Sequence, residues 1–151
     1  MIRCIIFVIL CATVGKGVAQ IHKNVDDLKT RLGMASHDTT RFKIYIDLSF
    51  AYTSIDMDSA FFYQRKAVDL RDAIPPIAFQ STIHNLTGVL FYRERNYDSS
   101  IYHYRKGLEI NQKIGRTYGI ALNYTQIGLL HYQLRDFDSA KHYYFLAKDL
   151  F

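Results

Sequence analysis

Asp56-Met57-Asp58-Ser59-Ala60, Asn96-Tyr97-Asp98-Ser99-Ser100 and Asp136-Phe137-Asp138-Ser139-Ala140 share one pattern and follow one another at equal spacing. Each segment begins with a residue whose side chain readily accepts hydrogen bonds from the first amides of a helix. Other positions keep the same register: Tyr52, Tyr92 and Tyr132; Ala67, Gly107 and Ala147; Leu70, Ile110 and Leu150; and Gly88 with Gly128. A fixed period of about 40 residues indicates a stack of similar supersecondary units.

Each unit divides into two helical patterns around its capping segment. In the third unit, apolar and small residues recur at steps of three and four on both sides of Arg135-Asp136. The first stripe comprises Ala121, Tyr124, Ile127, Gly128, Leu130 and His131, and the second Phe137, Ala140, Tyr143, Tyr144, Ala147 and Leu150. Such spacing places one buried stripe on each helix, so we predict a helical hairpin in every unit.

These patterns predict an all-α fold with about three stacked antiparallel hairpins. The expected repeats cover residues 38–76, 77–116 and 117–151, with helices near 38–54, 57–73, 77–94, 97–114, 117–134 and 137–151. Pro75-Pro76 ends the first hairpin and Gly115 the second, because a residue before proline avoids the helical region and glycine tolerates a left-handed cap. Residues 20–37 are expected to form a short N-terminal capping helix or a linker.

The repeat resembles the tetratricopeptide repeat, in which a small residue on the first helix meets small residues on the second. Gly128, Ala140 and Ala147 occupy these places, with Tyr144 and Leu150 as large core residues. The resemblance implies a right-handed superhelix that binds proteins or peptides. The first unit departs from the pattern, with Leu48 for the glycine and Gln64 for the aromatic residue. HEAT and armadillo repeats, whose periods are similar to the one seen here, are the alternative.

The period is longer than the usual tetratricopeptide period of about 34 residues. In this respect the repeat is similar to a form found in bacterial regulators. The segments Val25-Asp26-Asp27-Leu28-Lys29 and His37-Asp38-Thr39-Thr40-Arg41 look like the start of exported repeat regions in bacterial sensor kinases or regulators. This second resemblance implies that the chain is the input region of a signalling protein. Because the last predicted helix lacks a polar capping helix, we expect a longer chain, or a partner, or self-association through that helix.

Residues 1–19 have the pattern of a secretory signal peptide. A positive start at Arg3 precedes the apolar run 4–14, and Gly17-Val18-Ala19 suits cleavage before Gln20. Retention as a membrane anchor and a lipoprotein signal at Cys11 are the alternatives. Export predicts a periplasmic or extracytoplasmic location, with no membrane span in the mature chain.

Composition argues against several classes of function. Both cysteines fall in the leader, and the remaining chain carries 17 basic and 14 acidic residues without a basic stripe. We therefore expect no thiol chemistry, no nucleic-acid partner, no cofactor and no catalytic site. Six histidines lack metal-ligand spacing, so His131 is interpreted as a packed core residue and not as a ligand.

The remaining candidate site is the surface that the first helices would form. The resemblance implies groove positions at Tyr45, Ser49, Tyr52, Thr53, Asn85, Val89, Tyr92, Arg93, Thr125, Leu129, Tyr132 and Gln133. Tyr52, Tyr92 and Tyr132 would form a ladder suited to a protein or peptide partner, since tyrosine is common in binding hot spots. Two alternatives stay open: a structural stripe packed against the next repeat, and a receptor for a peptide or small molecule.

Overall fold

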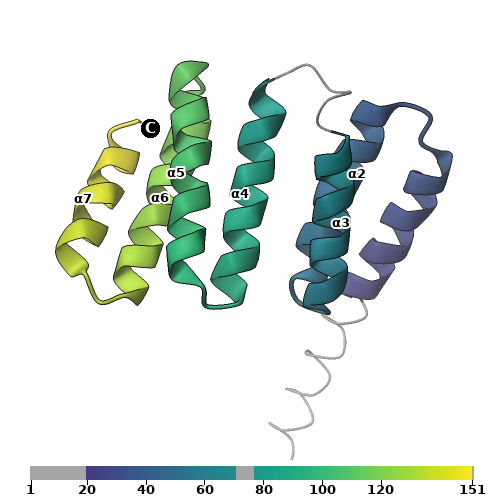
Figure 1. The fold of residues 1–151 in the computed structure, drawn as a ribbon, viewed down its shortest axis with the longest axis horizontal. Helices are drawn as coiled ribbons and strands as arrows, with labels where there is room; N and C mark the ends of the chain where they lie inside the picture. Colours follow the sequence, from purple (N-terminus) through teal and green to yellow (C-terminus); the bar gives the residue numbers. More distant parts are fainter. Residues whose placement is uncertain (1–19, 71–76, 151) are drawn as a thin grey trace, which may run out of the picture.

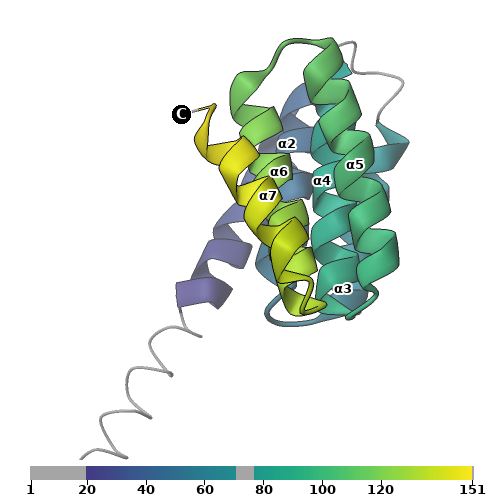
Figure 2. The ribbon, with the colours of Figure 1, turned by 90° about the vertical axis from the view of Figure 1, so that its left-hand side faces the viewer.

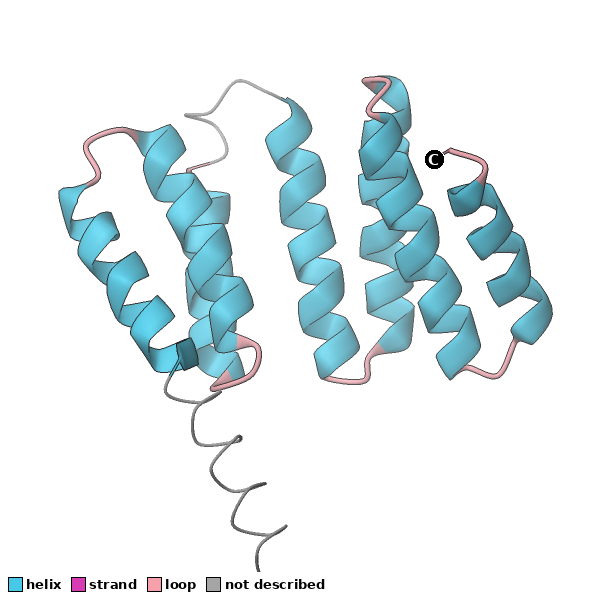
Figure 3. Cartoon of the chain, turned by 180° about the vertical axis from the view of Figure 1, so that it is seen from behind, coloured by secondary structure: helices cyan, strands magenta, loops and turns pink. Residues whose placement is uncertain are grey.

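The structure is a computed structural model that describes residues 20–70 and 77–150. Residues 20–34 are helical, and the elements that follow are α2 (Asp38–Tyr52), α3 (Met57–Asp69), α4 (Ile77–Arg93), α5 (Tyr97–Lys113), α6 (Thr117–Gln133) and α7 (Phe137–Lys148). Within these ranges the chain contains helices and loops and no strand (Figure 3). The predicted all-α fold is confirmed.

The helices pack as consecutive antiparallel pairs that follow one another along the long axis of the molecule (Figure 1). α2 pairs with α3, α4 with α5, and α6 with α7, while α4 also contacts α3 and α6 also contacts α5. The helix over residues 20–34 lies at one end and α7 at the other. This arrangement is a solenoid-like stack in which each hairpin contacts its sequence neighbours.

The helix starts follow from the predicted caps. The side chain of Asp56 accepts hydrogen bonds from the amides of Asp58 and Ser59, Asn96 from Ser99, and Asp136 from Ser139. The capping role is confirmed for the first residue of each segment. The hydrogen bond from the Ser59 hydroxyl holds the pKa of Asp56 below its usual range.

Small residues let the paired helices approach closely. A Cβ on Gly88 would lie 2.8 Å from the Tyr104 ring, and one on Gly128 3.0 Å from the Tyr144 ring. The Ser100 hydroxyl donates to the Gly88 carbonyl at 2.7 Å across the same contact. A Cβ on Gly128 would also lie 3.3 Å from the Ala140 carbonyl oxygen. The predicted contact between small residues of the two helices is therefore present in both hairpins, with an aromatic ring packed beside each glycine.

The helix over residues 20–34 covers the outer side of α2. Val25 and Leu28 are buried there in one cluster with Ile44 and Leu48 of α2. Without these two side chains, Ile44 and Leu48 would lose their cover on this side, so the short helix closes this end of the hydrophobic core.

The far end of the stack differs from the sequence prediction. The repeat pattern predicts Phe137 and Tyr144 as core residues, but their side chains are 58% and 38% exposed. The reason is that no described helix follows α7 to cover this face. The helices also end slightly before the predicted bounds wherever the end is described. The predicted signal peptide 1–19, the predicted helix stop at Pro75-Pro76 and Phe151 lie outside the described residues.

Candidate functional site

The predicted groove residues divide into an exposed group, a half-buried group and the fully buried Ser49. The exposed side chains belong to α4 and α6, the first helices of the second and third repeats. They are Arg93, Thr125, Tyr132 and Gln133. The half-buried ones are Tyr45, Tyr52, Thr53, Asn85, Val89, Tyr92 and Leu129. The amide of Gln133 lies 3.5 Å from the Tyr92 hydroxyl, to which it donates, so the ends of α4 and α6 meet side by side.

Tyr45 and Tyr52 form an aromatic cluster in the first hairpin. Both rings lie against Tyr63 of α3, with centroids at 6.2 Å and 5.4 Å. The Lys29 ammonium lies 5.6 Å from the centre of the Tyr52 ring, and its hydrogen bond with Tyr52 raises the pKa of Lys29. These contacts join residues 20–34, α2 and α3.

Tyr92 and Tyr132 occupy the same register but different surroundings. Tyr92 lies 6.0 Å from Tyr97 and packs against the buried cluster of Tyr104, Ile127 and Leu130. Tyr132 makes the corresponding ring contact with Phe137, at 5.6 Å, yet remains 54% exposed. Tyr92 is thus held between two repeats, whereas the surface beside Tyr132 is open. The ladder's role in binding remains a prediction.

Asn85 takes part in a buried network that the sequence did not indicate. Its side-chain oxygen accepts a hydrogen bond of 2.6 Å from Asn123, and Asn123 accepts one of 2.7 Å from Asn111. Asn111 and Asn123 are fully buried, and Asn123 also donates to the Tyr104 carbonyl. A Cβ on Gly107 would collide with the Asn85 amide, which explains the glycine at this position.

Ser49 is not a groove residue. Its side chain is fully buried and its hydroxyl donates to the Ala60 carbonyl at 2.7 Å. The prediction is wrong here because a small hydroxyl can donate its hydrogen bond to a nearby backbone carbonyl. The side chain can then be buried between α2 and α3.

A second unpredicted cluster is the pair His84 and His103. The Nδ1 atoms of the two rings lie 3.1 Å apart, between α4 and α5, and Phe91 stacks on His103 at 5.5 Å. Burial lowers the pKa of both imidazoles, and the charge of Lys106 lowers that of His84 further. The two histidines are distant in sequence and lie on different helices, so no local motif joins them.

His131 is packed as the sequence predicted. Its ring stacks on Tyr143 at 5.4 Å, and its Nδ1 lies 3.0 Å from the Asp136 carboxylate. Over the described residues, no group of three His, Cys, Asp or Glu side chains is arranged to hold a metal ion. In the same ranges, no helix combines the length and the apolar character needed to cross a membrane.

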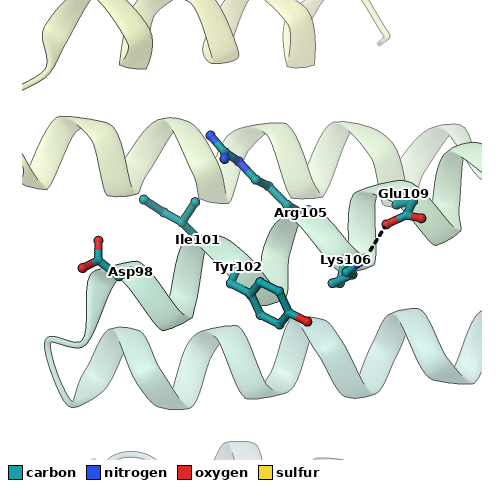
Figure 4. Close-up of a pocket in the computed structure, with 6 residues that line it drawn as sticks. All are labelled: Asp98, Ile101, Tyr102, Arg105, Lys106 and Glu109. Carbon is teal, nitrogen blue, oxygen red and sulfur yellow. Dashed lines mark hydrogen bonds and ion pairs between the residues drawn. The ribbon is translucent and has the colours of Figure 1, made fainter.

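The outer face of α5 bears a shallow hollow of about 540 Å³. All six lining residues come from that one helix: Asp98, Ile101, Tyr102, Arg105, Lys106 and Glu109 (Figure 4). Lys106 and Glu109 pair with each other at 3.0 Å. Because no second element contributes side chains, this hollow has no convergent polar groups that would define a ligand site.

Comparison with known proteins supports the fold alone. No protein-family model and no curated protein matches the sequence. The crystal structure of BtubC (BKLC) from P. vanneervenii superposes with a TM-score of 0.66 at 20% sequence identity. The match covers 89% of this chain and 55% of that protein, so the chain spans about half the length of this structural relative. The likeness, together with the paired helices, places the chain among helical repeat folds.

Proposed function

We propose that this chain is a protein-interaction module of the tetratricopeptide type. The supporting observation is that consecutive first helices present exposed side chains at repeating positions on a packed scaffold: Arg93 from α4, and Thr125 and Gln133 from α6. The Gln133–Tyr92 hydrogen bond couples the two helices at this surface. A partner lying across it would contact several repeats at once, which gives affinity without a closed pocket.

The module acts without catalysis in this proposal. The histidines with lowered pKa, His84 and His103, lie with their Nδ1 atoms against each other, so these two nitrogens are engaged within the pair. Binding is also the natural use of a scaffold whose exposed groups are Arg, Thr, Gln and Tyr.

The proposed location is outside the cytoplasm, as the input region of a bacterial signalling protein. Support comes from the leader sequence 1–19, with Arg3, the apolar run and Gly17-Val18-Ala19. A fusion of residues 1–151 to alkaline phosphatase in a bacterial host should be active and should begin at Gln20. Deletion of residues 2–19 should abolish the activity, and an unprocessed, inactive fusion would refute export.

Site-specific crosslinking tests the interaction surface. A photoreactive amino acid replaces Arg93 or Thr125 in the full chain, in cells of the source organism, and Arg65 on the outer face of α3 serves as the matched exposed control. The proposal predicts one discrete protein adduct from positions 93 and 125 and none from position 65. Equal adducts at all three positions, or none at 93 and 125, would overturn it.

A further inference from the structure

The second and third repeats each use their first helix, α4 or α6, to cover the hairpin before it. In α4, Phe79, Ile83 and Leu90 pack in one cluster with Ala60 and Ala67 of α3. The Gln64 amide also donates to the Thr87 hydroxyl at 2.9 Å. The cluster contains residues of α2 as well, so one helix of the second repeat closes the core of the first.

The next repeat covers its predecessor in the same register, one period later. Ile127 and Leu130 of α6 stand in the positions of Thr87 and Leu90, and they pack against Tyr104 of α5. Asn123, in the position of Ile83, donates to the Tyr104 carbonyl at 3.2 Å. The chain therefore shows twice what covers this kind of surface, namely a helix that presents apolar side chains to it.

The third copy of this surface lies at the end formed by α6 and α7, which faces the viewer in Figure 2, and no described helix packs over it. It is a hollow of about 330 Å³ lined by Tyr132, Phe137, Ala140, Lys141, Tyr144, Phe145 and Lys148, which we call the end face. Phe145 stands in the position of the exposed Arg65 and Arg105, so its ring extends the surface that the earlier repeats cover. Phe145 is 51% exposed, and Phe137 and Tyr132 are exposed to a similar extent. One repeat earlier, the corresponding Tyr92 and Tyr97 are packed against the cluster that α6 completes.

The charges of the end face distinguish its occupant from α4 and α6. Lys141 stands where the earlier repeats have Phe61 and Ile101, which pack in their clusters. Lys148 likewise stands in the position of Leu108. An occupant that buries the aromatic rings must meet two ammonium groups, so carboxylates opposite them are favoured.

We infer that the end face docks an amphipathic helix of a partner protein, with an apolar stripe in the register of α6 and acidic residues that face Lys141 and Lys148. The inference rests on the proposed function as an interaction module and names the kind of partner element. It concerns a surface separate from Arg93 and Thr125.

A second copy of the chain fits the end face less well. The stripes of α4 and α6 are already packed inside the stack. In α2 the corresponding positions are Thr39, Lys43, Asp47 and Phe50, of which two are charged. A symmetric pairing of two end faces would instead bring the lysines of both copies together, which is unfavourable.

Two synthetic helical peptides test the inference by fluorescence anisotropy with the full chain. Both carry glycine, asparagine, isoleucine and leucine at the spacing of Gly119, Asn123, Ile127 and Leu130, and alanine elsewhere. Four flanking positions are glutamate in one peptide and lysine in the other. The acidic peptide should bind, and the basic one should bind at least about tenfold more weakly.

Variants of the exposed rings locate the binding. Phe137→Ser with Phe145→Ser should weaken binding of the acidic peptide at least about tenfold, whereas Phe62→Ser on α3, at 46% exposure, should not. Lys141→Glu with Lys148→Glu should reverse the preference between the two peptides. Circular dichroism of each variant confirms that the helices remain.

Three outcomes would overturn the inference: no binding of either peptide, equal binding of both, or binding that survives the double ring substitution. A fourth outcome would also overturn it: analytical ultracentrifugation shows a dimer of the wild type, and Phe137→Ser with Phe145→Ser converts the dimer to a monomer. In that case a second copy of the chain would occupy the end face. None of these results bears on crosslinking at positions 93 and 125, so the two proposals fail separately.

Discussion

Gly128 lies where α6 and α7 approach most closely. A Cβ there would stand 3.0 Å from the Tyr144 ring and 3.3 Å from the Ala140 carbonyl oxygen. Gly128→Leu should therefore lower the free energy of unfolding by roughly 1–3 kcal/mol, since added bulk must displace a ring or a helix. Tyr132→Ala, at a 54% exposed side chain, should cost less than about 1 kcal/mol.

Urea unfolding of both variants measures the difference. Gly33→Leu is the matched control, because a Cβ on Gly33 meets no atom within 4 Å. Equal losses for Gly128→Leu and Tyr132→Ala would show that Tyr132 belongs to the core and that the predicted groove position is wrong.

Arg95 and Arg135 adopt left-handed backbone conformations, with φ of 61° and 62°, in the turns that precede the Asn96 and Asp136 caps. A left-handed residue with a Cβ costs roughly 1–2 kcal/mol, and glycine avoids that strain. Arg135→Gly should thus raise the free energy of unfolding, by up to about 1 kcal/mol after the entropy of glycine in the unfolded chain is counted. Arg65→Gly, within α3, should lower it by a similar amount.

Thermal unfolding at neutral pH compares these two variants. An unchanged or lower melting temperature for Arg135→Gly would mean that the arginine side chain stabilises the turn by more than its backbone costs.

At the scale of the elements, helix starts are easier to predict than contacts between helices. The starts of α3, α5 and α7 follow from a local signal, a capping Asp or Asn, so their positions can be read directly from the sequence. The Asn85–Asn123 bond and the His84–His103 contact join residues that are distant in sequence and lie on different helices. Periodicity reports which face of a helix is apolar and carries no information on which polar residues meet inside.

The same limit explains the exposed rings of α7. The pattern correctly places Phe137 and Tyr144 on the stripe that earlier repeats bury. Burial, however, needs a following helix, and the described residues contain none. An apolar stripe in the sequence therefore predicts which face of a helix is apolar. Whether that face is buried depends on a neighbouring helix.

The asparagine network should tie α6 to the second hairpin. Asn123 bonds to Asn85, Asn111 and the Tyr104 carbonyl, so Asn123→Leu would leave the Asn111 amide and the Asn85 side-chain oxygen without this partner. Each such group costs about 1–3 kcal/mol, which predicts a loss of at least about 2 kcal/mol in the free energy of unfolding.

Thr125→Ala is the control on the same helix, because Thr125 is exposed and its hydroxyl donates to the Ala121 carbonyl within its own turn. Urea unfolding followed by circular dichroism compares the two. A loss for Asn123→Leu no larger than that for Thr125→Ala would show that the network adds little to the packing.

The histidine pair should make the α4–α5 hairpin sensitive to acid. Both folded-state pKa values lie below the unfolded value of about 6.5, so protons bind the unfolded chain more tightly. The contribution of the two neutral imidazoles to the free energy of unfolding is fully present above about pH 6.5. It is lost as the pH falls through their folded-state pKa values. Protonation of both rings would also break the bond between the Nδ1 atoms and place two charges side by side.

Urea unfolding between pH 7.5 and 5 measures this dependence. His103→Gln should make the curve flatter, because it removes one of the two paired imidazoles. Equal slopes for the wild type and His103→Gln would show that the pair is neutral to folding.

At the scale of the whole molecule, stability should decrease from the middle of the stack toward its open end. α4, α5 and α6 each pack against helices on more than one side, whereas α7 contacts α6 and leaves its aromatic rings exposed. Because repeats are stabilised by their neighbours, α7 should unfold locally more often than α5. Hydrogen exchange read by mass spectrometry should accordingly show faster exchange in α7 than in α5.

The acidic helical peptide connects this gradient to binding. A helix that occupies the end face supplies the neighbour that α7 lacks, so at saturation it should slow exchange in α7 and leave α5 almost unchanged. The basic peptide is the control and should have no effect on either helix. Equal protection of α5 and α7 in the free protein would mean that the stack unfolds as one cooperative unit, and then the peptide would slow exchange in both helices together.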